Sequence, residues 1–435
     1  MLNTSPIRWK ALPAATGIAL ALALTLGPAT AQRAATGLPA TATPESVGLN
    51  SARLKKVVEM LADETKAGRL AGATILVGKQ GKIALFETIG ELDPTKKTPM
   101  TRDAIFRIYS MTKPITSVAA MMLVEDGKLF LAEPVAKYIP EFADVKVGVE
   151  QKAADGKITL AFEPARRPMT VQDLLRHSSG LTYGFFGTGL VKKAYVDSGF
   201  LSKDQTNEEL SKALAKLPLM HQPGSNWEYS HATDVLGRVI EVASGQTLYA
   251  FMKARILDPL GMKDTSFFVK DEKDFPRIAE PHPTDRNFGA GADLFDPRKP
   301  VKYESGGGGL MSTTSDYARF LQMMINGGTL DGKRILSPAT IRYMTSDHTT
   351  GMGLGSAYLP GDGYGFGLGF QVRRDDGMSP IPGTKGDYAW GGAAGTAFWV
   401  DPERKMYVIM MIQAPKHRTP IRTKLRDMIY SAVDK

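Results

Sequence analysis

The 435-residue sequence contains no cysteine. This absence excludes disulfides, a thiol nucleophile, a zinc site built from thiolates and an iron–sulfur cluster held by cysteine. Histidine is scarce as well, with six residues, and they form no serine–histidine–aspartate set that we can identify. No serine stands in a Gly-x-Ser-x-Gly sequence, the mark of a nucleophile elbow. Without disulfides, the fold has to be held by its core.

Long apolar runs are missing except near the N-terminus. Basic residues precede an apolar run over residues 11–26, and Ala29-Thr30-Ala31 ends it in small-x-small form. This pattern predicts a secretory signal over residues 1–31, with cleavage after Ala31. The alternative is an uncleaved membrane anchor, which the shortness of the run and its proline and glycine disfavour. We therefore expect a periplasmic or secreted protein that has no stable membrane insertion after signal removal.

Positive charge exceeds negative charge without being concentrated. The formal charge of +9 falls to +7 when the signal, which carries two basic residues and no acid, is removed. Basic pairs such as Lys55-Lys56 and Arg166-Arg167 are isolated, whereas nucleic-acid binding requires a clustered stripe. We expect no nucleic-acid partner. The oligomeric state stays unknown from the sequence.

Strand patterns occur near both ends of the chain. Residues 71–78 and 82–89 are rich in β-forming residues, and Lys79-Gln80-Gly81 between them is a turn sequence. Residues 393–400 and 405–413 repeat this arrangement around Asp401-Pro402-Glu403. Each pair predicts an antiparallel hairpin.

Helical patterns fill the region between the hairpins. We expect helices at residues 51–66, 110–126, 232–243 and 316–325, several of them ending at a glycine. Strands at both ends with helices between them predict an α+β fold, in which one antiparallel sheet is built from both termini and a mainly helical domain is inserted. The expected divisions are a flexible leader at 32–43, an α/β domain from 44–114 and 335–435, and the helical insertion at 115–334.

The first candidate for chemistry is Ser110-Met111-Thr112-Lys113, at a predicted helix start. Residues three apart share a helix face, and the free N–H groups and positive dipole of a helix start favour an activated serine. A Ser-x-x-Lys spacing alone is expected about once or twice by chance in a chain of this size. The bare spacing therefore also fits a surface helix with a capping serine and a solvated lysine.

Two further segments carry candidate residues. Tyr229-Ser230-His231 precedes a predicted helix, where Tyr229 could relay a proton or simply pack against the core. His231 could bind substrate or make a local hydrogen bond. In Trp390-Gly391-Gly392-Ala393 the paired glycines allow close approach of a ligand or of another backbone, and a backbone N–H there could join that of Ser110 in an oxyanion hole. For the glycines alone, a bulge packed under a neighbouring helix is the favoured explanation.

Together and in this order, the three segments resemble the serine β-lactamase and penicillin-binding-protein-like superfamily, most closely its family VIII carboxylesterases. The resemblance also covers Phe106-Arg107-Ile108-Tyr109, residues 170–181, residues 227–230 and residues 308–313, and it spans nearly the whole mature chain. It implies a β-lactamase/transpeptidase-like fold. It also implies Ser110 as nucleophile, Lys113 as its base partner, Tyr229 as the tyrosine that shares the proton, and the N–H groups of Ser110 and Ala393 as the oxyanion hole.

The resemblance implies no metal and no organic cofactor. Candidate substrate-binding residues are Tyr109, His231, Trp390, Gly391 and Gly392. The chain departs from the antibiotic-binding branch at His231, where that branch has asparagine, and at Trp390, where it has a cation. Loss of that cation removes a partner for a substrate carboxylate and favours neutral esters.

The sequence thus predicts a serine esterase acting on small to medium carboxylic esters through an acyl-enzyme on Ser110. One alternative is a D-peptidase, amidase or β-lactamase with the same nucleophile. An alternative of another class is a ligand-binding protein of the same fold without turnover.

Overall fold

The computed structural model describes residues 37–202, 204–288, 293–355 and 358–434. The predicted secretory signal, residues 1–31, lies outside the described residues, as does the first part of the predicted leader. From Gly37 onward the chain forms one compact unit. No helix of the described part is long and apolar enough to cross a membrane.

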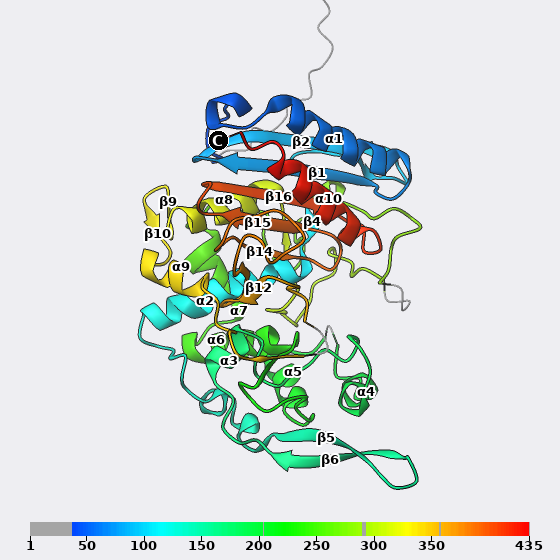
Figure 1. Cartoon of the computed structure of the whole chain (residues 1–435), viewed down its shortest axis with the longest axis vertical. Helices are drawn as coiled ribbons and strands as arrows, with labels where there is room; N and C mark the ends of the chain where they lie inside the picture. Colours follow the sequence, from blue (N-terminus) through cyan, green and yellow to red (C-terminus); the bar gives the residue numbers. More distant parts are fainter. Residues whose placement is uncertain (1–36, 203, 289–292, 356–357, 435) are drawn as a thin grey trace, which may run out of the picture. The chain divides into compact units, whose positions relative to one another are not determined.

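A large antiparallel sheet organises this unit (Figure 1). Its strands are β1 (Gly72–Lys79), β2 (Lys82–Asp93), β3 (Thr98–Pro99), β12 (Tyr364–Phe366), β13 (Gln371–Arg373), β14 (Tyr388–Gly391), β15 (Ala397–Asp401) and β16 (Met406–Ile412). In the described chain they lie in the order β12-β13-β14-β15-β16-β1-β2-β3. The pairing of β1 with β16 joins strands from the two ends of the chain, which confirms the predicted α+β fold.

Both predicted hairpins are present, although the second has a different start. Gln80 and Gly81 between β1 and β2 have φ of 53° and 72°, as in tight hairpin turns. β15 begins at Ala397, four residues after the predicted start. Residues 392–396 form a turn instead, because Gly392 N donates to Thr396 O across it at 2.8 Å and Gly395 adopts φ of 116°.

One face of the sheet is covered by the terminal helices α1 (Ser51–Lys66) and α10 (Arg418–Tyr430), which lie side by side (Figure 1). Alternation along β1 explains this layer, because Ile75 and Val77 join the apolar cluster under these helices, while Leu76 joins the cluster on the opposite face. α1 has the predicted bounds, and the Asn50 side chain caps it by accepting from Arg53 N.

The opposite face is covered by α8 (Thr314–Ile325), which packs against β1 and β16. Beyond it lies α2 (Thr112–Glu125), which packs against α6 (Ala232–Ser244) and α7 (Leu248–Met252). Every residue of α2 from Thr112 to Leu123 is buried, including the polar Lys113 and Thr116, so neighbouring elements enclose this helix on all sides.

The remaining elements connect and enclose these layers. The strands are β4 (Phe106–Arg107) with β8 (Met311–Ser312), β5 (Lys146–Lys152) with β6 (Ile158–Pro164), β7 (Asn226–Trp227) with β11 (Gly353–Leu354), and β9 (Thr329–Leu330) with β10 (Lys333–Arg334). The helices are α3 (Val171–Leu175), α4 (Leu190–Asp197), α5 (Asn207–Leu214) and α9 (Pro338–Met344). Short helical turns are η1 (Pro44–Val47), η2 (Tyr109–Met111), η3 (Val135–Lys137), η4 (Pro140–Asp144), η5 (Lys253–Leu257) and η6 (Glu272–Arg277).

The end of the predicted leader is attached to the sheet. Ile83 N donates to Ala40 O, and Ala42 N donates to Ile83 O, at 3.0 and 2.9 Å. The expectation of a flexible leader up to residue 43 is therefore wrong for these residues, since their backbone groups pair with β2. The predicted boundaries at 114/115 and 334/335 stay a prediction.

Candidate active site

Ser110 lies where a short strand passes into the central helix. β4 pairs with β8, and the turn η2 then leads directly into α2. Tyr109, just before the serine, has φ of 43°, a conformation that is strained for a residue other than glycine and is often found at active sites. Ser110 is half-buried, and its backbone N–H has no acceptor within the described part of the chain. A free N–H therefore stands beside the candidate nucleophile.

Lys113 is fully buried one turn later in α2. Its Nζ donates to the carbonyl oxygen of Gly307 at 2.7 Å and to the hydroxyl of Tyr183 at 3.2 Å. The same Nζ lies 4.5 Å from the centre of the Tyr229 ring. No carboxylate forms an ion pair with it among the residues described. The amine is thus positioned by a carbonyl, a phenol and an aromatic face.

Tyr229 is buried just before α6, inside a group of aromatic rings. Its ring is nearly parallel to that of Trp227, with centres 6.0 Å apart, and it lies 5.1 Å from Tyr183. Trp390 from β14 contacts it from another side at 5.4 Å. The structure thus brings all three predicted segments together at Tyr229.

Asp234 is a buried carboxylate that the sequence reasoning missed. It accepts from His231 Nδ1 at 3.1 Å, from the Ser305 hydroxyl at 2.6 Å and from Gly307 N at 2.9 Å. Burial alone would raise its pKa, but the hydrogen bond and charge of His231, the charge of Lys113 and the Ser305 hydrogen bond hold the pKa well below its usual range. The backbone of Gly307 links this carboxylate to Lys113, because the Gly307 N–H donates to Asp234 and the Gly307 carbonyl accepts from Lys113.

Tyr183 was missed as well, although it stands two residues after a segment that carries the resemblance. Thr170 and Asp173 form a capping box at α3, and Asp173 also accepts from Arg167 and Arg176. These bonds anchor the start of the segment that leads to Tyr183. Burial and the charge of Asp234 raise the pKa of Tyr183 well above its usual value, which keeps its hydroxyl protonated. Only the fold joins it to Lys113, seventy positions away in the chain.

The third segment leaves the sheet beside Ser110. A Cβ on Gly392 would lie 2.3 Å from the carbonyl oxygen of Ile108, so only glycine fits this approach. The next residue, Ala393, has a backbone N–H without an acceptor in the described chain. Trp390 is 7% exposed, and its indole N–H has no hydrogen-bond partner among the described residues.

Two predicted substrate-binding residues have partners within the protein. The Tyr109 hydroxyl accepts from Phe295 N at 3.3 Å, and burial raises its pKa to about 12. His231 uses Nδ1 for Asp234, while its ring packs against Tyr183 at 4.2 Å. His231 therefore makes the local hydrogen bond that the sequence left open as an alternative. Gly391, the remaining glycine of the segment, lies against the Arg422 guanidinium.

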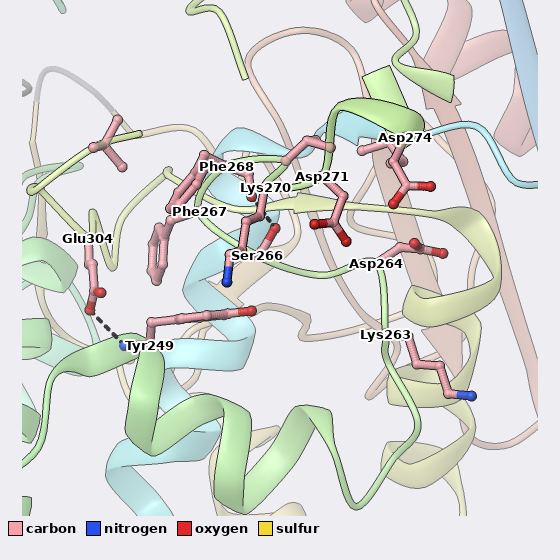
Figure 2. Close-up of a pocket in the computed structure, with 13 residues that line it drawn as sticks. Tyr249, Lys263, Asp264, Ser266, Phe267, Phe268, Lys270, Asp271, Asp274 and Glu304 are labelled. Atoms are coloured by element: carbon pink, nitrogen blue, oxygen red, sulfur yellow. Dashed lines mark hydrogen bonds between the residues drawn. The ribbon is translucent and has the colours of Figure 1, made fainter. Parts of the chain in front are cut away.

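Two hollows of the surface lie outside this group of residues. One is a cavity of about 180 Å³. Its lining residues include Tyr249, Phe267 and Glu304 (Figure 2). A groove of about 560 Å³ lies between β6 and α4. Neither lining contains Ser110, Lys113 or Tyr229. No group of three or more histidine, aspartate or glutamate side chains that could hold a metal ion occurs in the described ranges.

Comparison with known proteins defines the class to which this fold and site belong. The family model "Beta-lactamase" matches residues 56–428, and the chain belongs to this family. The solved structure of EstCE1, described as a hydrolase with promiscuous acyltransferase activity, aligns with a TM-score of 0.72 at 26% identity. That alignment covers 89% of this chain and 99% of EstCE1.

Two curated relatives are similar over most of their length. Protein Rv1367c of Mycobacterium tuberculosis is 39% identical over 355 residues, which are 80% of this chain and 86% of the relative. Esterase EstB of Burkholderia gladioli is 31% identical over 409 residues, which are 89% of this chain and 98% of the relative. The predicted β-lactamase/transpeptidase-like fold and superfamily are therefore confirmed.

Proposed function

We propose that this protein is a serine hydrolase that cleaves small to medium carboxylic esters through an acyl-enzyme on Ser110. The observation that carries the proposal is the setting of Lys113. The amine is buried, lacks a carboxylate partner within the described residues, and faces the ring of Tyr229 one helical turn from the serine. The esterase names of relatives such as EstB support the reaction class.

In the proposed acylation step, Ser110 Oγ bonds to the ester carbonyl carbon and loses its proton to the Lys113–Tyr229 pair. The tetrahedral intermediate then breaks the bond to the leaving alkoxide, which receives that proton and departs as an alcohol. Water attacks the acyl-enzyme in the same way and releases the carboxylic acid and free Ser110. Tyr183, protonated and bonded to Lys113, holds the amine in place during both steps.

The proposed oxyanion hole consists of the N–H groups of Ser110 and Ala393. Both lack an acceptor within the described chain, and the approach of Gly392 to Ile108 brings their two segments together. Fixed backbone donors aimed at the developing negative charge stabilise the transition state more than the ground state. Removal of one such donor typically lowers kcat by about 10²–10³-fold.

An apolar, uncharged substrate fits the surroundings of this centre. Trp390 stands where the antibiotic-binding branch has a cation, and its unpartnered indole N–H can donate to a substrate oxygen. Phe186 adds a further ring 5.8 Å from Tyr229. We propose Trp390, Gly391 and Gly392 as the substrate contacts of this segment. Export to the periplasm or beyond, by way of residues 1–31, is part of the same proposal.

The same nucleophile would also serve a D-peptidase, amidase or β-lactamase, and a putative D-alanyl-D-alanine carboxypeptidase of Escherichia coli is 26% identical over 405 residues. Catalytic efficiency on a p-nitrophenyl ester, a D-alanyl dipeptide and nitrocefin separates these activities. We expect the ester to be preferred. A burst of product without turnover would instead indicate a ligand-binding protein of the same fold.

Substitution of the nucleophile tests the proposal directly. We expect Ser110→Ala to lower kcat on p-nitrophenyl butyrate by about 10⁴-fold or more and to abolish labelling by a fluorophosphonate probe. Ser117→Ala is the matched control, since Ser117 lies in α2, the helix that follows Ser110, and its buried hydroxyl has no partner among the described residues. Full turnover in Ser110→Ala would refute the proposed function.

A further inference from the structure

Arg422 of α10 binds three backbone carbonyls of one short turn. Its Nη2 donates to the carbonyl oxygens of Gly392 and of Thr396, the latter at 2.6 Å, and its Nε donates to that of Gly395 at 3.3 Å. These three residues belong to the turn 392–396, which connects β14 to β15. A planar guanidinium with a fork of donors can make such a set of bonds, whereas an ammonium group is a point charge.

The bond to Gly392 acts on the peptide unit that carries the Ala393 N–H. The carbonyl of Gly392 and the N–H of Ala393 belong to one planar trans peptide, so they point in opposite directions. When Arg422 holds the carbonyl on its side, the N–H is turned to the other side. A charged donor on the carbonyl also polarises the peptide and strengthens its N–H as a donor.

The surroundings of Arg422 agree with a fixed position. A Cβ on Gly391 would lie 2.8 Å from the guanidinium carbon, so a side chain at this position would displace Arg422. The same turn meets the segment before Ser110, because Gly392 lies against the carbonyl of Ile108.

We propose that Arg422 is a positioning residue that orients the 392–393 peptide as an oxyanion donor. The inference rests on the proposed acyl-enzyme function and adds a residue from the C-terminal helix to it. Arg422 does not touch the substrate in this proposal. The positive charge of Arg422 is used in hydrogen bonds to backbone carbonyls and does not bind a substrate carboxylate. Neutral esters therefore remain the proposed substrates.

The test compares Arg422→Ala and Arg422→Lys with Arg418→Ala as the matched control. Arg418 lies one turn earlier in α10 and donates to the carbonyl of Pro415, outside the turn. With p-nitrophenyl butyrate we expect Arg422→Ala to lower kcat by about 10–100-fold and to change KM by less than about threefold, since a misplaced donor loses part of the effect of a deleted one. Arg422→Lys should recover only a small part of the loss.

Two further readouts separate positioning from a merely structural role. Guanidinium chloride at low millimolar concentration should restore kcat of Arg422→Ala severalfold and should leave Arg418→Ala unchanged. The affinity for a boronic acid that mimics the tetrahedral intermediate should fall in parallel with kcat. If Arg422→Ala does not fold, the kcat and boronate affinity of Arg422→Lys decide the question.

The proposal is overturned if the Arg422 variants keep kcat within twofold of the parent, or if guanidinium rescues neither kcat nor boronate affinity. It is also overturned if the change is a rise in KM confined to a negatively charged ester such as a monosuccinate, which would make Arg422 a substrate ligand. These outcomes leave the esterase proposal intact, because Ser110→Ala and the comparison of the three substrates test that proposal separately.

Discussion

Two lysines of the protein, Lys113 and Lys192, are fully buried, and their partners differ. Lys113 is held by the carbonyl of Gly307 and the hydroxyl of Tyr183. Lys192, in α4, forms an ion pair with Glu228 at 2.9 Å, and both side chains are at most 1% exposed. Glu228 immediately precedes Tyr229. Lys113 therefore contacts the ring of Tyr229, whereas Lys192 contacts the side chain of the residue before it.

The difference between these partners matches two different roles, a proposed catalytic role for Lys113 and a structural role for Lys192. A carboxylate in direct contact favours the charged form of an amine, which suits a structural ion pair and prevents action as a base. Lys113 is joined to the buried carboxylate of Asp234 only through the backbone of Gly307. Lys192 by contrast ties α4 to the segment that carries Tyr229. Burial alone does not distinguish a lysine that acts as a base from one with a structural role. The group that contacts the amine directly does distinguish them.

Lys113→Met should have the largest effect on turnover. We expect kcat on p-nitrophenyl butyrate to fall by about 10³-fold or more, because the Lys113–Tyr229 pair that takes the Ser110 proton in the proposed mechanism loses its amine. The free energy of unfolding should change by only about 1–2 kcal/mol, since a carbonyl and a phenol lose one hydrogen bond each. Steady-state kinetics and urea unfolding measure both quantities. A kcat within tenfold of the parent would remove the contrast between the two lysines.

Lys192→Met should show the reverse pattern. It leaves Glu228 buried without its cation, and we expect a loss of about 3–5 kcal/mol in the free energy of unfolding. The double variant Lys192→Met/Glu228→Met should recover most of that loss, because it removes both charges from the interior. Urea unfolding of the three proteins gives the comparison, and kcat of the folded double variant should remain within about tenfold of the parent. A double variant as unstable as the single one would contradict this account.

Protonation of Glu228 at low pH should have the smallest of the three predicted effects, a loss in the free energy of unfolding. Burial opposes its ionisation, but the nearby His221 and the direct contacts with Lys192 and the Thr182 hydroxyl lower its pKa to about 2. A carboxyl whose pKa is lower in the folded state stabilises the fold above its unfolded pKa, and that stability is lost as the pH falls from about 5 to 2. The shift corresponds to about 3 kcal/mol.

Urea unfolding at pH 7, 4 and 3 measures this loss. The parent should become less stable towards low pH, and the double variant Lys192→Met/Glu228→Met should lose a smaller part of its stability over the same interval. Equal acid sensitivity in both proteins would show that other carboxyl groups dominate the pH dependence.

Local patterns predicted the regular elements well. The 51–66 helix has the predicted bounds, and the 79–81 turn lies where its residues indicate, because periodicity and turn residues act over a few positions. The start of β15 was predicted four residues early. Residues 393–396 are Ala-Ala-Gly-Thr, mostly weak strand formers, and contacts with the Ile108 segment and with Arg422 make them a turn.

The sequence by itself determined the hairpins near both ends, the helices between them, and the ordered segments around Ser110, Tyr229 and Trp390. Only the tertiary structure decided which residues support them. Tyr183, Asp234 and Arg422 are ordinary residues in their own segments and carry no local signal. Folding brings Tyr183 to the Lys113 amine, Asp234 to the backbone of Gly307 and Arg422 to the turn 392–396. Contacts between residues so far apart in the chain produce no periodic pattern in the sequence.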